Sequence, residues 1–318
     1  MNGQVKNSIE STPISFIAFF GNVDASIQGV GLGNGFSIGQ CSTDECLSLL
    51  SKLENIPTPM ALTHLLDSTN CLNREEGKCY YVRSELGTCG TEETEIAKMV
   101  ESFDYSMVQD YLDHRIRMMR LFKLGNVCLP LKYYFQEDEN GDVRNCGYGG
   151  KMSTVIKDPY TLEHQELDEL RMFLKATPVV IHHEYVQRSI AQYDVAYQTH
   201  KKNLVFQLLL NVVEYLTAYE IDTRDNETVS RSIAILLGSD RDRSRNIERD
   251  LNQLFRKQRK LTIMGESSLI EHMDVMKARV YAMESIKEVL SMNIPKKELV
   301  RILGKCGHGQ RPWRRNSI

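Results

Sequence analysis

A basic segment in the last quarter of the chain carries the side chains best suited to bind phosphate. It runs from Leu254 to Glu266, and its four cations are Arg256, Lys257, Arg259 and Lys260. Guanidinium and ammonium groups donate charge-assisted hydrogen bonds to phosphate oxygens, and the planar guanidinium can contact two oxygens at once. These four residues are therefore candidates to contact the backbone of an RNA, and the alternative is that Arg256, Lys257 and Lys260 form a solvated helix face while Arg259 caps helix carbonyls.

Histidines are the side chains most able to move a proton near neutral pH, and the basic segment contains none. The nearest is His272, eight residues after Met264. His182 and His183 are adjacent, and neighbouring positions on a helix point about 100° apart, so they form a poor chelating pair. His308 lies close to the C-terminus. These histidines are the candidates for a general acid or base that serves the basic segment.

The cysteines and the acidic loop do not match the common metal sites. The chain has eight cysteines and no Cys-x-x-Cys pair, a pattern that favours reduced thiols over a disulfide framework. The spacing of Cys71, Cys79 and Cys89 is wrong for the usual zinc sites. In the acidic run 137–142 the glycine is out of register for a calcium loop, and Asn140-Gly141 predicts a hairpin turn instead. We expect no metal and no cofactor.

The two halves of the chain differ in pattern and charge, which predicts an α+β protein. We expect a mixed α/β domain over residues 1–176, an all-α bundle over 177–305 and a loose basic tail over 306–318. From Thr177 onward there are 23 Lys and Arg against 17 Asp and Glu, whereas the earlier residues hold 16 against 25. The charge difference favours separate partners for the two halves, or an attraction between them.

The first half reads as alternating strands and helices. Glycines at alternate positions from Gly29 to Gly35 predict turns or bulged strands. A helix begins at Ser42–Glu45 and is expected to end at Pro57 and Pro59. The remaining expected elements are strands over 79–83 and 127–135 and helices over 94–123 and 162–175.

The second half reads as consecutive helices. His182-His183-Glu184 opens the first, and the apolar stripe over 204–216 predicts a core helix. The helix over 240–260 has eight Lys and Arg against four Asp and Glu. Ser268–Glu271 predicts a capping box for the next helix. That helix is expected to bury an apolar stripe made of Leu269, Met273, Met276, Val280 and Met283.

The second half resembles a HEPN domain of the ApeA-like branch of prokaryotic HEPN proteins, over about residues 180–305. The features that carry the resemblance lie in four consecutive segments, three on expected helices and one in the turn that follows. They are Val213-Glu214-Tyr215-Leu216, Ile235-Leu236-Leu237-Gly238, Leu254-Phe255 followed by Arg259, and the turn Ile263-Met264-Gly265. The family typically reads Arg-Ser-Lys-Ile-Val-His-Gly where this chain reads Arg-Lys-Leu-Thr-Ile-Met-Gly.

The resemblance implies a helical bundle that dimerises and, in active members, cuts RNA without a metal ion. Each protomer of such a dimer contributes an arginine and a histidine to a shared cleft, where a ribose 2′-hydroxyl attacks its own phosphate. Arg259 stands at the arginine position. Met264 stands at the histidine position, and its thioether can neither accept nor donate the proton. Loss of one general acid–base group typically costs about 10²- to 10⁴-fold in rate.

Three functions follow from these observations. The first is a catalytically degenerate HEPN-like protein that binds RNA or regulates a partner in a prokaryotic defence or toxin-like system. The second is an active, metal-independent endoribonuclease that uses a substitute histidine, either His272 or one of His182, His183 and His308 from a partner chain. The third is a structural subunit of a larger assembly.

The expected location is the cytoplasm, without membrane attachment. The most apolar run, 204–216, contains Gln207, Asn211 and Glu214 and is too short to span a bilayer. The first twelve residues show no signal-peptide pattern.

Overall fold

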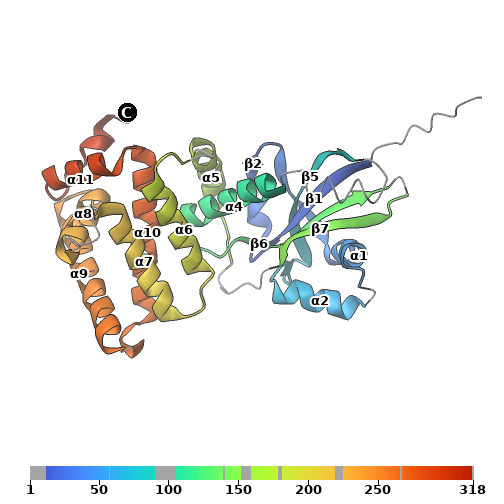
Figure 1. Ribbon diagram of the computed structural model, residues 1–318, viewed down its shortest axis with the longest axis horizontal. Helices are drawn as coiled ribbons and strands as arrows, with labels where there is room; N and C mark the ends of the chain where they lie inside the picture. The colour runs from blue at the N-terminus through green and yellow to red at the C-terminus, as the bar shows by residue number, and fades with distance from the viewer. Residues whose placement is uncertain are drawn as a thin grey trace, which may run out of the picture. The chain divides into compact units, whose positions relative to one another are not determined.

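The computed structural model describes residues 12–56, 58–89, 105–138, 140–151, 159–177, 181–218, 225–265 and 267–316. The chain forms two compact units, Met1–Ala176 and Thr177–Ile318. The first contains an antiparallel sheet with helices, and the second is built from helices (Figure 1). The protein is therefore α+β. Among the described residues, no helix is long and apolar enough to cross a membrane.

The sheet of the first unit is antiparallel throughout its described ladders. Its strands follow the order β2-β3-β5-β1-β6-β7, and β4 pairs with β5. Strands β1 and β6 lie centrally and are rich in aromatic and branched residues, as expected for buried strands. The bounds are β1 Thr12–Gly21, β2 Gly31–Gly33, β3 Phe36–Ser42, β4 Leu72–Asn73, β5 Lys78–Cys89, β6 Cys128–Glu137 and β7 Val143–Lys151.

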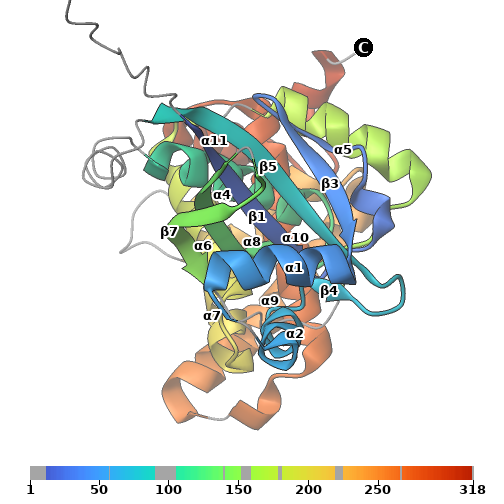
Figure 2. The same ribbon diagram turned by 90° about the vertical axis from the view of Figure 1, so that its right-hand side faces the viewer.

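Alternation along the strands gives the sheet two buried faces. Ile17 and Phe19 belong to a core with residues of α1 and α2, so these helices cover one face. Figure 2 shows α1 in front of the strands. Tyr134 points to the other face, where its hydroxyl accepts a hydrogen bond from Gln109 of α4 at 3.0 Å. The helices of this unit are α1 Thr43–Glu54, α2 Pro59–Ser68, α4 Tyr105–Phe122 and α5 His164–Ala176, with a 3₁₀ turn η1 at Ala25–Ile27.

The start of α1 and the two predicted turns form as expected. Ser42 is the N-cap of α1, and its hydroxyl and the Glu45 carboxylate complete a capping box. Asn34 and Gly35 adopt positive φ in the turn between β2 and β3, and Gly141 does so between β6 and β7. Part of the helix expected over 94–123 lies outside the described residues, and α4 accounts for the rest.

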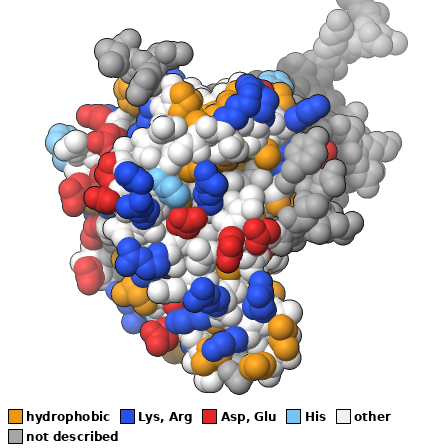
Figure 3. All heavy atoms as spheres, turned by 90° about the vertical axis from the view of Figure 1, so that its left-hand side faces the viewer, with side chains coloured by type: hydrophobic (Ala, Val, Ile, Leu, Met, Phe, Trp, Pro, Cys, Tyr) orange, Lys and Arg blue, Asp and Glu red, His pale blue; other side chains and the backbone are white. Residues whose placement is uncertain are grey.

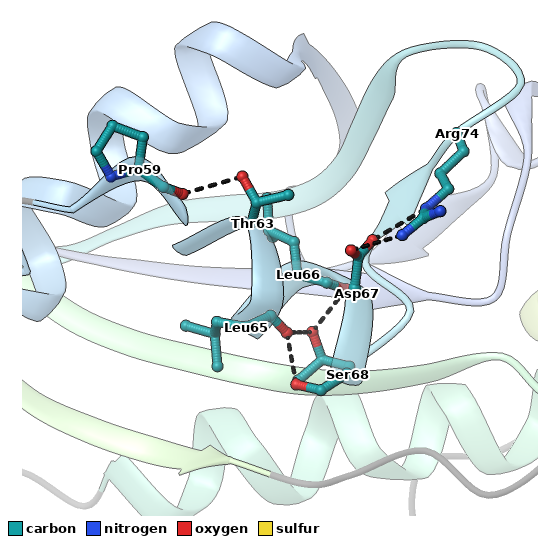
Figure 4. A network of polar contacts seen from close by, with 8 residues as sticks. Pro59, Thr63, Leu65, Leu66, Asp67, Ser68 and Arg74 are labelled. Atoms are coloured by element: carbon teal, nitrogen blue, oxygen red, sulfur yellow. Dashed lines mark hydrogen bonds and ion pairs between the residues drawn. The ribbon is translucent and has the colours of Figure 1, made fainter. Parts of the chain in front are cut away.

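Helix α1 ends at Glu54, before the two prolines as expected, but Pro59 also begins a second helix, α2, that the sequence pattern did not predict. The backbone N–H at the first position of a helix has no partner within the helix. Proline has no N–H, so it is tolerated at this position. Figure 4 shows the Thr63 hydroxyl donating to the Pro59 carbonyl at 3.0 Å. At the other end of α2, the Arg74 guanidinium donates two hydrogen bonds to the Asp67 carboxylate, at 3.1 and 2.6 Å. This pair ties α2 to the turn that precedes β5.

The second unit packs its helices around α7. The buried residues of α7 include Phe206, Leu209 and Val213, which face the neighbouring helices. A helix that is apolar on most sides is expected at such a central position. The bounds are α6 Glu184–Tyr197, α7 Lys202–Thr217, α8 Asn226–Leu237, α9 Arg241–Met264, α10 His272–Met292 and α11 Lys296–Lys305, with 3₁₀ turns η3 Ser267–Leu269 and η4 Pro312–Asn316.

The capping box expected at Ser268–Glu271 is wrong by three residues. Ser267–Leu269 forms a 3₁₀ turn, and α10 begins only after Glu271. Its cap pairs Glu271 with Asp274, whose carboxylate accepts the Glu271 backbone N–H at 2.8 Å. A carboxylate near the first turn satisfies a free backbone donor and also favours the positive end of the helix dipole.

Candidate nucleic-acid interface

Helix α9 has well-defined ends that fix which way its side chains point. Its N-cap is Asp240, whose carboxylate accepts the Arg243 backbone N–H at 2.8 Å. It ends at Gly265, which has φ of 67° and donates its N–H to the Leu261 carbonyl at 3.0 Å. Glycine adopts this left-handed conformation without the cost that a side chain would add. The buried residues of α9 are Ser244, Ile247, Leu251, Leu254, Phe255 and Leu261.

The opposite side of α9 carries a row of cations that we call the cationic stripe. The row has six positions and runs from Arg241 to Lys260. Since a helix turns about 100° per residue, the six positions fall within one sector of about 100°, and the stripe is about 28 Å long. Figure 3 looks onto the side of the molecule where α8, α9 and α11 lie in Figure 1, and many Lys and Arg side chains are visible there. The stripe consists of the exposed residues Arg241, Arg245, Arg249, Arg256, Arg259 and Lys260.

The charges of the stripe are not neutralised by the described part of the chain. No described carboxylate forms an ion pair with a stripe residue, whereas other cations of this unit are paired. Arg249 donates instead to the Asn246 side chain at 2.6 Å. The pKa of Asp225 is lowered mainly by the Glu227 N–H and the Thr228 hydroxyl, with a smaller contribution from the charge of Arg259. The stripe therefore leaves a positive field open to an anionic ligand.

The structure separates the four cations predicted to bind RNA. Arg256, Arg259 and Lys260 lie in the stripe, but Lys257 points to another side of α9. Its ammonium contacts both oxygens of Asp274 at 2.9 and 2.7 Å. Because Asp274 also caps the start of α10, Lys257 ties α9 to α10, and its charge is neutralised.

Sequence reasoning missed half of the cationic stripe. Arg241, Arg245 and Arg249 lie one helical turn or more before the basic segment, and they were not proposed as binding residues. The signal that could have found them is the spacing of three or four residues, which places them on the same side as Arg256 and Lys260.

The residues expected to carry catalysis lie at one end of the unit. Met264 is the last residue of α9, and its side chain is 63% exposed. His272 is the first residue of α10 and is also exposed. Arg259 lies more than one turn before Met264, on a different side of the helix. The exposed thioether at position 264 offers no group that titrates.

The other histidines are held elsewhere. His308 lies with its Nε2 2.8 Å from the Glu248 carboxylate, near the other end of α9. Glu248 and Arg259 are separated by eleven residues, which is about 16 Å along the helix. His308 is therefore far from Arg259 within one chain. His183 is the N-cap of α6, and His182 precedes it in the chain and is exposed.

The basic tail is docked on the bundle through residue 314, which corrects the expectation that it is loose. Glu288 of α10 accepts hydrogen bonds from Trp313 at 2.8 Å and from Arg314 at 3.0 Å, and it pairs with Arg311 at 2.9 Å. Burial raises the pKa of Glu288, but the hydrogen bonds from Arg314 and Trp313 outweigh it, so the pKa lies below its ordinary value. Arg311 and Arg314 are therefore paired within the protein by Glu288.

The apolar stripe expected in the core of α10 is only partly buried, and Leu269 and Met276 are half-buried. Met273 is 62% exposed and Val280 is 36% exposed, whereas Met283 is buried. The buried face of α10 instead includes Val275, Ala278, Ala282, Ser285, Ile286 and Val289. The short residues at these positions allow α10 to pack closely against α7. The sequence pattern was therefore assigned to the wrong side of the helix.

Met273 and Val280 line a groove of about 680 Å³ between α9, α10 and the tail. Charges of both signs flank it, and most are paired with each other. Asp250 contacts Lys277 at 3.2 Å and accepts a hydrogen bond from Tyr281 at 3.0 Å. Unlike the cationic stripe, the groove does not favour one sign of ligand charge.

Comparisons with known proteins add no assignment to this geometry. No family model, no curated protein and no solved structure matches the chain. Within the described ranges, no group of three or more His, Cys, Asp or Glu side chains is arranged to hold a metal ion. The case for a function rests on the cationic stripe and on the residues at the end of α9.

Proposed function

We propose that this protein is a HEPN-like RNA-binding protein that has lost the ability to cut RNA. The cationic stripe on α9 carries the proposal. Its six charges extend along one exposed side, and no described carboxylate pairs with them. RNA is the partner that such a row of positive charge suits, because phosphates repeat along its backbone and each neutralised phosphate releases counterions.

The residue at the end of α9 supports a binding role rather than a catalytic one. The HEPN resemblance places Met264 where active members have histidine, and this side chain is exposed rather than used in the core. Arg259 keeps a charge that can contact a phosphate. Without an imidazole partner, the site can hold the phosphate but cannot move a proton at the 2′-hydroxyl.

In this proposal the protein acts as a homodimer that regulates a partner within a prokaryotic defence or toxin-like system. The dimer would place two copies of α9 in one assembly and double the positive surface offered to one RNA. Size-exclusion chromatography with light scattering measures the dimer directly. A monomer at all concentrations would remove this part of the proposal without affecting RNA binding.

The test combines binding and cleavage on the same protein. Wild type is expected to bind a labelled single-stranded RNA at low salt and to leave it uncut in the presence of EDTA. Met264→His is expected to restore cleavage by about 10²- to 10⁴-fold over the wild-type background, because it returns a general acid–base group. Arg259→Ala in the Met264→His protein should remove this gain. Cleavage by wild type that Arg259→Ala abolishes would refute the degenerate function.

A second candidate is an active ribonuclease that uses His272. The observation in its favour is that His272 is exposed at the first residue of α10, the helix that follows the Met264 turn. His272→Ala should then abolish metal-independent cleavage by wild type and leave RNA binding intact. No cleavage of any RNA by wild type, with or without a triggering partner, excludes this candidate.

A third candidate is an assembly subunit in which the cationic stripe contacts an acidic protein. This function predicts no measurable RNA affinity at low salt, whereas an RNA-binding function requires it. The binding assay therefore separates the two directly.

A further inference from the structure

Three cysteines of the first unit lie together where β3 meets α1. Cys41 directly precedes Ser42, the N-cap of α1, and Cys46 is the fourth residue after that cap. Residues at these two positions pack against each other at many helix starts, in the contact known as the hydrophobic staple. The capping box at Ser42 fixes this geometry. Cys41 and Cys46 are therefore brought together by the local structure of the helix start.

The third thiol comes from the neighbouring strand. Cys79 of β5 is the direct partner of Cys41 in the antiparallel ladder, and the Cys41 thiol lies 3.8 Å from the Cys79 carbonyl oxygen. Cys46 and Cys79 are fully buried in the core beneath α1, and Cys41 packs at its edge. The cluster therefore has one thiol that is partly open to solvent and two that are not.

The environment makes Cys41 the reactive member. A hydrogen bond with Cys46 lowers the pKa of the Cys41 thiol, against burial and the charge of Glu45, which raise it. The same contact, a second one with Cys79 and burial raise the pKa of Cys46, which stays protonated. A partly exposed thiol with a lowered pKa, next to a buried thiol, is the arrangement that oxidises first and then forms a disulfide.

We propose that Cys41 is a site of oxidation by hydroperoxides and that Cys46 resolves the product to a disulfide. The Cys41 thiolate sulfur attacks the distal peroxide oxygen, the O–O bond breaks, and the alkoxide leaves and takes a proton to become an alcohol. Cys41 is now a sulfenic acid. The Cys46 sulfur then attacks the Cys41 sulfur, the S–O bond breaks, and the hydroxide leaves with the Cys46 proton as water. Both thiols are oxidised, and the peroxide is reduced.

The site stands independently of RNA binding, because it lies in the first unit and uses no residue of α9. Its ligand class is a small hydroperoxide that can reach the edge of the sheet. Hydrogen peroxide is the probe for the test, since it is the smallest member of that class. The disulfide would join the end of β3 to the first turn of α1, two elements that the capping box already holds together.

The test maps the disulfide on the full-length protein. Wild type is treated with hydrogen peroxide, its free thiols are blocked, and it is digested with a protease that cleaves before aspartate. Asp44 lies between Cys41 and Cys46, so a disulfide between them holds two peptides together until it is reduced. We expect this linked pair as the first product. A first product that joins Cys41 to Cys79, or one that lacks Cys41, would overturn the assignment.

Single variants give a second readout. Cys41→Ser is expected to abolish the disulfide, and Cys46→Ser to leave a Cys41 sulfenic acid that dimedone traps. Cys306→Ser, which changes a buried thiol of the second unit, is the matched control and should behave as wild type. If Cys46→Ser fails to fold, Cys46→Ala replaces it. Absence of dimedone labelling at Cys41 in a folded Cys46 variant would also overturn the proposal.

Discussion

The cationic stripe predicts how RNA affinity depends on salt when part of it is removed. The perturbation is the triple variant Arg245→Gln, Arg249→Gln and Arg256→Gln. All three side chains are exposed, and none has a carboxylate partner among the described residues. Exposed substitutions of this kind usually change stability by less than about 0.5 kcal/mol each, so the fold should persist. Circular dichroism melting checks this before binding is measured.

The magnitude follows from counterion release. For single-stranded nucleic acid, the logarithm of affinity falls with the logarithm of salt by about 0.7 per neutralised phosphate. Six stripe contacts give a slope of about −4, and the triple variant should give about −2. Between 50 and 200 mM salt, wild type should lose about 300-fold in affinity and the variant about 20-fold. The salt slope depends on the number of phosphate contacts, so it reports their loss separately from a change in overall affinity.

Fluorescence anisotropy of a labelled single-stranded RNA over a KCl series measures both slopes. The matched control is Arg188→Gln, Arg301→Gln and Lys305→Gln, which removes the same charge from exposed positions on α6 and α11. Its slope should stay near that of wild type. Equal loss of slope in both triple variants would show that net charge alone drives binding, and it would refute an interface on α9.

The tail, the contact between α9 and α10, and a buried glycine supply three further tests. Glu288→Gln should cost about 3 kcal/mol in unfolding free energy, because it leaves the largely buried Arg311 without its carboxylate. Since the pKa of Glu288 is lowered in the fold, its stabilisation is present at neutral pH and is lost as pH falls below about 4. Fluorescence of Trp313, the single tryptophan, reports whether the tail stays docked. Lys257→Ala should lower stability by about 1 kcal/mol in urea unfolding and leave the salt slope unchanged, because its charge is already paired. Gly238→Ala should cost about 1–3 kcal/mol, because a Cβ would lie 1.9 Å from a serine hydroxyl oxygen, whereas Gly304→Ala meets nothing within 4 Å and serves as the control.

Local patterns in the sequence were sufficient for the fold class and for several helix starts and turns, although helix α2 and the start of α10 were missed. The capping box at Ser42 and the hairpin turn at Gly141 each depend on a few adjacent residues. Such signals need no partner from elsewhere in the chain, so they can be recognised directly. The α+β class follows from the same patterns, because strand-like alternation stops before the helical half.

The sequence alone could not decide which side of a helix meets the core. α10 offers two rows with helical spacing, one of methionines and valine and one of alanines, valines, serine and isoleucine. Hydrophobicity favours the row that contains Met273, yet the other row packs against α7, because its short side chains permit close approach. Burial depends on the shape of the neighbouring helix, which a pattern within one helix does not contain.

The same limit applies to the candidate site. The sequence identified Arg256, Arg259 and Lys260 as cations, and helical spacing extends that row to Arg241. It could not show that Lys257 is neutralised by Asp274, or that Arg311 and Arg314 are paired with Glu288. A charge is free or paired according to what lies within about 4 Å of it, and those neighbours come from distant parts of the chain. The sequence supplied the charges of this protein, and the tertiary structure decided which of them remain available to a ligand.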